Sequence, residues 1–190
     1  MRNAVSYLVV LLLFGMAVPA AKGLGFFDPV LLAAYACLGM IFAGPAAAQA
    51  FEKRPASLAQ AVQWIAKAAA FGELLAIAMV ACGIGTVYVT HRGYVFPPDL
   101  ESLAFAVLLG LAGSLTVASL AGWVTVQVSS QASRMALRVV FVGLVALFYF
   151  KGRWLPSIVE MGTVLCLLAT GVFVLLLRLR LARAAEAIQP

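Results

Sequence analysis

Long runs of apolar residues follow one another along the whole sequence, and most of them are long enough to cross a bilayer as a helix. A helix needs about 20 mostly apolar residues to cross the hydrocarbon core. Charged residues make up 11% of the chain, whereas soluble domains average about 25%. These features predict an all-α membrane protein with six transmembrane helices in a single polytopic domain. The predicted spans lie at about residues 4–21, 29–50, 68–89, 103–128, 135–150 and 157–177.

The first apolar run has two interpretations. It follows Arg2 and ends in the small residues of 17–21, a pattern that is also typical of a cleaved signal peptide. We interpret residues 4–21 as a retained first span, and the signal peptide is the alternative.

The basic residues lie at the ends of the apolar runs, so the net charge of +6 indicates membrane orientation rather than nucleic-acid binding. With the N-terminus inside, the external segments contain four cations, Lys22, Arg92, Lys151 and Arg153. The cytoplasmic segments contain nine, namely Arg2, Lys53, Arg54, Lys67, Arg134, Arg138, Arg178, Arg180 and Arg183. Because cytoplasmic loops carry an excess of Lys and Arg, we predict that both termini are cytoplasmic, in a bacterial-type inner or plasma membrane.

The segment between the second and third spans, residues 51–67, is predicted to form a short amphipathic cytoplasmic helix. Pro55 ends the preceding span, and the pair Ser57 and Gln60 has the spacing of a capping box. A predicted apolar stripe follows at Leu58, Val62 and Ile65, with Trp64 as an interface anchor. We expect this helix to lie across the membrane face; continuity with the third span is the alternative.

Small residues recur at four-residue intervals in the fourth span. They are Gly110, Ser114, Ala118 and Gly122. This spacing places them on one helical face, and such faces let transmembrane helices approach closely. The sequence therefore predicts a packing face here, either within the chain or between subunits.

No catalytic, metal-binding or cofactor-binding motif is present in the sequence. It contains no HExxH and no GxxxxGK[ST], its three cysteines are widely separated, and His91 is its one histidine. We therefore expect no enzymatic activity, metal or cofactor.

Two carboxylates, Glu73 and Glu160, lie within apolar runs, where charge is costly and often functional. Both lie near a membrane surface rather than at its centre, which favours a structural role over a proton relay. For Glu73 we expect either solvation or an ion pair with Lys67 or Arg134, and for Glu160 an ion pair with Lys151 or Arg153.

The layout resembles the permease subunit of ABC-2 type transporters over roughly residues 25–180. That family shows small residues, an acidic–basic cluster, a short helix and then a lysine, an order present in AQAFEKRPASLAQAVQWIAKAAAFGE. Also similar are the Gly-, Ala- and Ser-rich fourth span, the turn SSQASRMALR and the apolar run after it. The resemblance implies a homo- or hetero-oligomeric, typically dimeric, permease coupled to a separate cytoplasmic ATPase through residues 58–67. The implied coupling residues are Glu52, Lys53, Arg54, Gln63 and Lys67.

A non-catalytic structural or accessory subunit of a larger membrane complex explains the same features. Short loops, small-residue faces and the absence of catalytic motifs fit both hypotheses. The permease hypothesis predicts that a nucleotide-binding protein co-purifies with the chain. The accessory hypothesis predicts a fixed stoichiometry with a complex that contains no ATPase.

Overall fold

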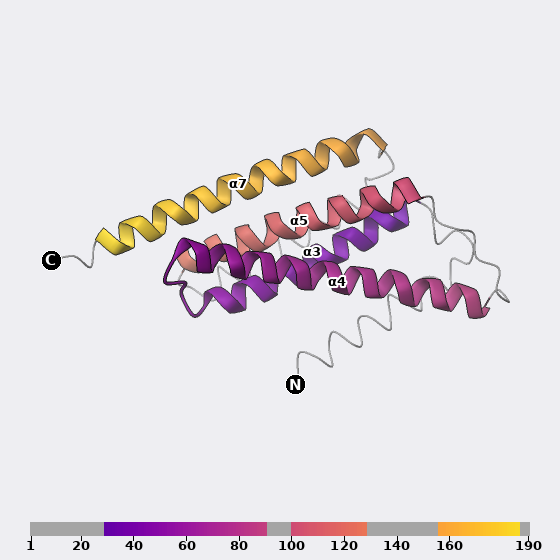
Figure 1. The fold of residues 1–190 in the computed structure, drawn as a ribbon, viewed down its shortest axis with the longest axis horizontal. Coiled ribbons are helices and arrows are strands. Elements are labelled where there is room, and N and C mark those ends of the chain that lie inside the picture. Colours follow the sequence, from indigo (N-terminus) through magenta and orange to yellow (C-terminus); the bar gives the residue numbers. More distant parts are fainter. Residues whose placement is uncertain (1–28, 91–99, 129–155, 187–190) are drawn as a thin grey trace.

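A computed structural model describes residues 29–90, 100–128 and 156–186, and all of its regular structure there is helical. Four long helices fill these ranges (Figure 1). They are α3 (Pro29–Phe51), α4 (Leu58–Thr90), α5 (Leu100–Gln127) and α7 (Pro156–Glu186). Apolar runs become helices in a membrane because a helix satisfies every backbone hydrogen bond within its own segment.

Three stretches of these helices are long and apolar enough to cross a membrane. They are Leu58–Gly83, Val107–Gln127 and Gly162–Arg183. The chain is therefore a helical, multi-pass membrane protein. The helix α3 coincides with the predicted second span, and its 23 residues include no charged side chain. The predicted spans at 4–21 and 135–150 lie outside the described residues.

The helices α3 and α4 run in opposite directions, whereas α5 and α7 run in the same direction (Figure 1). The end of α5 therefore lies at the opposite end of the bundle from the beginning of α7. The ends of α3, α5 and α7 and the beginning of α4 lie together at one end of the bundle.

The predicted short helix across the membrane face is not formed as a separate element. Residues 58–67 are the first turns of α4, a continuous helix of 33 residues, which corresponds to about 50 Å. This stretch contains no proline or glycine before Gly72 and is rich in alanine, the strongest helix former. Nothing in the sequence breaks the helix between the connector and the third span. The connector is therefore continuous with that span, which is the alternative considered above.

The connection between α3 and α4 is a tight loop with a well-formed helix cap. The Gln60 amide donates to Ser57 Oγ at 3.2 Å, as the capping box predicts. Gln60 Oε1 accepts a hydrogen bond from the Ala56 amide at 2.7 Å, one residue earlier than the usual return bond. Arg54 adopts a left-handed conformation with φ of 52°, which reverses the chain after α3.

Small residues bring α3 close to its neighbours. A Cβ atom built on Gly72 of α4 would overlap the carbonyl oxygen of Gly39, and one built on Gly44 would lie 3.0 Å from Val117 Cγ1 of α5. Close backbone approach of this kind replaces the hydrophobic effect as the source of helix association inside a bilayer.

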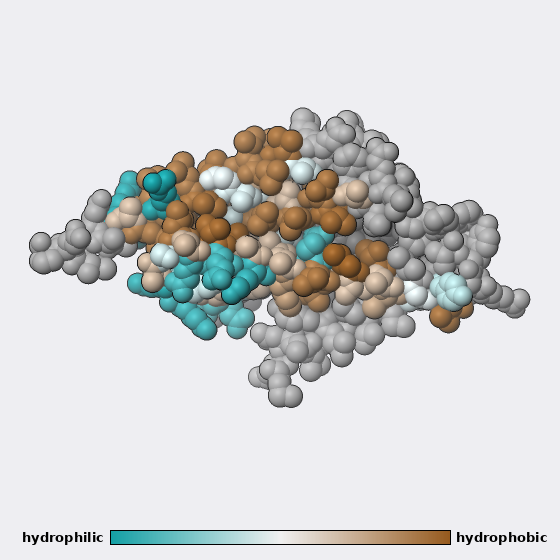
Figure 2. Space-filling view, viewed as in Figure 1, coloured by the Kyte–Doolittle hydropathy of each residue, from teal (hydrophilic) through white to brown (hydrophobic). Residues whose placement is uncertain are grey.

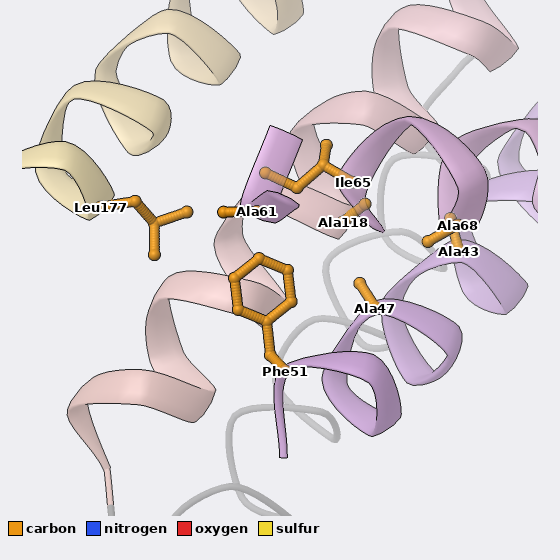
Figure 3. Close-up of a cluster of buried hydrophobic side chains, with 8 residues drawn as sticks. All are labelled: Ala43, Ala47, Phe51, Ala61, Ile65, Ala68, Ala118 and Leu177. Carbon is orange, nitrogen blue, oxygen red and sulfur yellow. The ribbon is translucent and has the colours of Figure 1, made fainter. Parts of the chain in front are cut away.

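The main apolar cluster lies at the end of the bundle where α3 meets α4 (Figure 3). Phe51, the last residue of α3, is at its centre, with 1% of its surface exposed. The buried members of the cluster are Ala43, Ala47, Phe51, Ala61, Ile65, Ala68, Ala118 and Leu177. Side chains from all four helices therefore meet around one aromatic ring directly before the loop begins.

Candidate docking surface

The polar residues of the α3–α4 connection form an exposed surface at one end of the bundle. We call this surface the charged end; it comprises Glu52, Lys53, Arg54, Gln63 and Lys67. All five side chains are exposed, and Figure 2 shows most of the hydrophilic residues gathered toward this end of the molecule. The structure thus brings the residues singled out from the sequence to one place.

The basic residues of α7 lie at the same end of the bundle. The described part of the chain contains six Lys and Arg residues, and all are exposed there: Lys53, Arg54, Lys67, Arg178, Arg180 and Arg183. The described acidic side chains are those of Glu52, which is exposed, and Glu73, which is buried. The charged end therefore presents a surplus of positive charge.

Aromatic side chains lie immediately behind the charged end. The rings of Phe51 and Trp64 meet edge to face, with centroids 5.6 Å apart and planes at 81°. Trp64 and Trp123 both pack against the Phe51 cluster. Tryptophans next to a layer of basic residues are typical of a membrane–water interface.

The Phe51 cluster fixes the loop to the bundle. A Cβ atom on Gly122 of α5 would lie 2.8 Å from the Phe51 ring, so the ring is held against the α5 backbone. Ala61 and Ile65 of α4 are buried in the same cluster. Both helices that flank the loop are therefore anchored within about two turns of it.

The predicted apolar stripe of the connector is correct at Ile65 and wrong at Val62. Ile65 is 3% exposed and Leu58 is half-buried, whereas Val62 is 44% exposed. Besides Ile65, the buried face of α4 runs through small residues, at Ala61, Ala68 and Gly72. The pattern in the sequence predicts that the larger side chains face inward. Close contact between α4 and α3 requires small side chains at the contact, so Val62 lies on the exposed side of the helix. Trp64, predicted as an interface anchor, is half-buried against Phe51.

The four-residue ladder of α5 lies inside the bundle. Gly110, Ser114, Ala118 and Gly122 are all buried, and Ala118 belongs to the Phe51 cluster. The Phe51 ring occupies the space above Gly122. The ladder therefore packs helix against helix within this chain.

Glu73 lies on α4 directly after the Gly39–Gly72 contact. It is 8% exposed, and its Oε2 atom accepts no hydrogen bond in the part of the chain that the structure describes. Lys67 is exposed, so the structure does not bring these two expected partners together. The other expected partner, Arg134, and the side chain of Glu160 with Lys151 and Arg153 lie outside the described residues.

A polar contact between α5 and α7 was not anticipated from the sequence. Thr116 Oγ1 lies within hydrogen-bond distance of two carbonyl oxygens, that of Cys166 on α7 at 2.7 Å and that of Ala112 on its own helix at 2.9 Å. It also lies 3.1 Å from Thr170 Oγ1. Thr170 Oγ1 donates to the Cys166 carbonyl at 2.9 Å. In the sequence, the one sign of this contact is a threonine within each apolar run. Thr116 and Thr170 are 54 positions apart, so only the fold shows that they meet.

The charged end consists of a few polar and ionic side chains. No group of three His, Cys, Asp or Glu side chains that could hold a metal ion occurs among the described residues. The exposed groups at the charged end are cations, one carboxylate and an amide, which suit ionic and hydrogen-bonded contacts with another molecule. Comparison of the chain with family models, curated proteins and solved structures found no match.

Proposed function

We propose that the chain is the membrane-spanning permease subunit of an ATP-driven, ABC-2-like transporter, and that a separate cytoplasmic ATPase docks on the charged end. The observation that carries the proposal is the attachment of an exposed charged loop to the centre of a helical bundle through Phe51. The charged end then faces the cytoplasm, in keeping with its surplus of Lys and Arg.

A docking surface that drives transport must transmit force to the spans. The loop between α3 and α4 is short, and both flanking helices pack into the Phe51 cluster within about two turns of it. The Ser57–Gln60 cap removes freedom at the beginning of α4. A displacement of the loop by a partner therefore moves α3 and α4 together instead of being absorbed by a flexible connector.

The chemistry of the charged end favours an acidic partner surface. Lys53, Arg54 and Lys67 are exposed, with Glu52 as the neighbouring anion. Complementary charge fixes the orientation of two partners and speeds their encounter more than it raises affinity. We therefore expect charge reversal to weaken the assembly most strongly at low salt.

The proposal is tested by crosslinking at Gln63, an exposed residue on the second turn of α4. A Q63C variant in a background without the native cysteines is treated with a bifunctional thiol–amine reagent in native membranes, then purified. The expected product contains a nucleotide-binding protein, and K53E/R54E reduces its yield. Recovery of Q63C with no crosslinked nucleotide-binding protein would disprove the permease proposal.

The orientation is tested with the same variant. A membrane-impermeant maleimide is expected to label Q63C in permeabilised cells and in inverted vesicles but not in intact cells. The matched control is a cysteine at Tyr88, an exposed residue near the opposite end of α4. Y88C should be labelled in intact and in permeabilised cells but not in sealed inverted vesicles. Labelling of Q63C from outside intact cells would contradict a cytoplasmic charged end.

A second candidate function is a non-catalytic accessory subunit of a larger membrane complex. The observation that favours it is the continuity of α4, because residues 58–67 form no separate helix lying across the membrane face. Under this alternative, the Q63C crosslink captures a membrane protein in fixed stoichiometry, and no nucleotide-binding protein is present in the purified complex.

A further inference from the structure

One side of α7 is apolar and faces away from the bundle. Leu168, Val172, Leu175 and Leu179 are 48% to 63% exposed. Their spacing of four, three and four residues places them on the same side of the helix. The opposite side packs on the bundle through Thr170 and Leu177.

The exposed apolar side of α7 ends in two arginines. Arg183 follows Leu179 by four residues and so continues the spacing, and Arg180 is its neighbour at i−3. Both guanidinium groups are exposed. The result is a continuous surface with a hydrocarbon part and a cationic end.

We propose that this surface binds an anionic phospholipid in the leaflet at the charged end. The acyl chain lies along Leu168, Val172, Leu175 and Leu179, and the phosphate is held by Arg180 and Arg183. Guanidinium groups match the geometry of phosphate oxygens with paired hydrogen bonds.

The combination of an apolar surface with two arginines at its end favours a phospholipid over other ligands. A free phosphate ion would use the arginines but gain nothing from four exposed apolar side chains. A soluble acidic protein would not reach Leu168, because Gly162–Arg183 is itself long and apolar enough to be a membrane span. The assignment to lipid is independent of the ATPase partner, since it uses none of the five residues of the charged end.

Native mass spectrometry of the full-length protein tests the proposal. The purified protein is mixed with equal amounts of dioleoyl phosphatidylglycerol and dioleoyl phosphatidylcholine, and retained lipid adducts are counted. We expect preferential retention of phosphatidylglycerol, and a decrease of roughly tenfold in that preference for R180Q/R183Q, because each cation near an anionic headgroup contributes measurably. The matched control, K53Q/R54Q, removes the same charge from the loop and should keep the preference.

Three outcomes would overturn the proposal. One is equal retention of the two lipids by the wild-type protein. Another is an equal loss of preference in the control variant, because that would reflect net charge alone. The third is displacement of phosphatidylglycerol by millimolar glycerol phosphate, which would assign the arginines to a free phosphate. The variant R180K/R183K keeps the positive charge but loses the guanidinium pair. Its preference for phosphatidylglycerol should lie between that of the wild type and that of R180Q/R183Q. A preference equal to that of the wild type would contradict phosphate binding by the guanidinium pair.

Discussion

The carbonyl oxygen of Gly39 lies against the Cα atom of Gly72, so closely that a Cβ atom on Gly72 would overlap it. The obstacle on α3 is backbone, which cannot move aside as a flexible side chain can. The helices α3 and α4 therefore depend on glycine at this crossing.

We predict that Gly72→Ala destabilises the protein by about 1–3 kcal/mol, the usual cost of overpacking, through forced separation of α3 and α4. Thermal unfolding of the detergent-purified variant would measure the loss. The control is Gly85→Ala on the same helix, where an added Cβ meets nothing within 4 Å. Alanine there should be neutral or stabilising by up to about 1 kcal/mol, since glycine is the weaker helix former. Equal stability of the two variants would argue against the close crossing.

Replacement of Phe51 by alanine should loosen the end of the bundle that carries the loop. The ring contacts Trp64 and Gly122 and is almost completely buried. A cavity of this size costs about 3–5 kcal/mol in a packed interior. The measurement is again thermal unfolding, together with the quenching of tryptophan fluorescence, because Trp64 loses its neighbouring ring. Val62→Ala, at an exposed site on α4, should change either value little.

Thr116→Val should weaken the contact between α5 and α7. The substitution removes the donor to the Cys166 carbonyl and the contact with Thr170 while keeping the shape of the side chain. Hydrogen bonds between transmembrane helices contribute about 0.6 kcal/mol on average. Thr125→Val is the matched control, because Thr125 Oγ1 bonds to the Ala121 carbonyl of its own helix. A double-mutant cycle with Thr170→Val gives the coupling energy, and a value near zero would exclude an interhelical bond.

Arg54→Gly should stabilise the loop by up to about 1 kcal/mol. Arg54 has a φ of 52°, a conformation that is strained for residues with a Cβ atom and free of strain for glycine. An increase in the midpoint of thermal unfolding would confirm the effect. Lys53→Gly is the control at the adjacent exposed position, which has a negative φ, and it should be neutral or destabilising. If partner crosslinking at Q63C is retained in Arg54→Gly, the backbone turn rather than the Arg54 charge supports docking.

Local signals in the sequence predicted several elements well. The run 29–50 became Pro29–Phe51, and the Ser57–Gln60 pair forms the predicted cap. Both depend on side chains within a few residues of one another. The end of α7 was predicted less well: the helix continues nine residues past the expected boundary at Leu177, to Glu186. Apolarity predicts where the bilayer ends, but leucine, arginine and alanine continue the helix beyond it.

The contacts that organise the candidate site were not accessible to the same reasoning. The exposure of Lys53, Arg54 and Lys67 follows from their charge alone. The burial of Ala61 in place of Val62 does not, because here the smaller side chain is the one that faces the neighbouring helices. The ring contact between Phe51 and Trp64 depends on the loop conformation that returns α4 against α3. These features are decided by the shape of neighbouring helices and not by periodicity within one segment.

The continuity of α4 connects the two sides of the membrane mechanically. Its 33 residues reach from the charged loop to Thr90 without interruption, and a helix of about 50 Å exceeds the hydrocarbon thickness of about 30 Å by several turns. A rotation or tilt imposed at Leu58 is therefore carried as a rigid-body motion to the far side. The Gly39–Gly72 contact lies along the way, and because the facing groups there are backbone atoms, α4 has no flexible side chain between itself and α3 at that level.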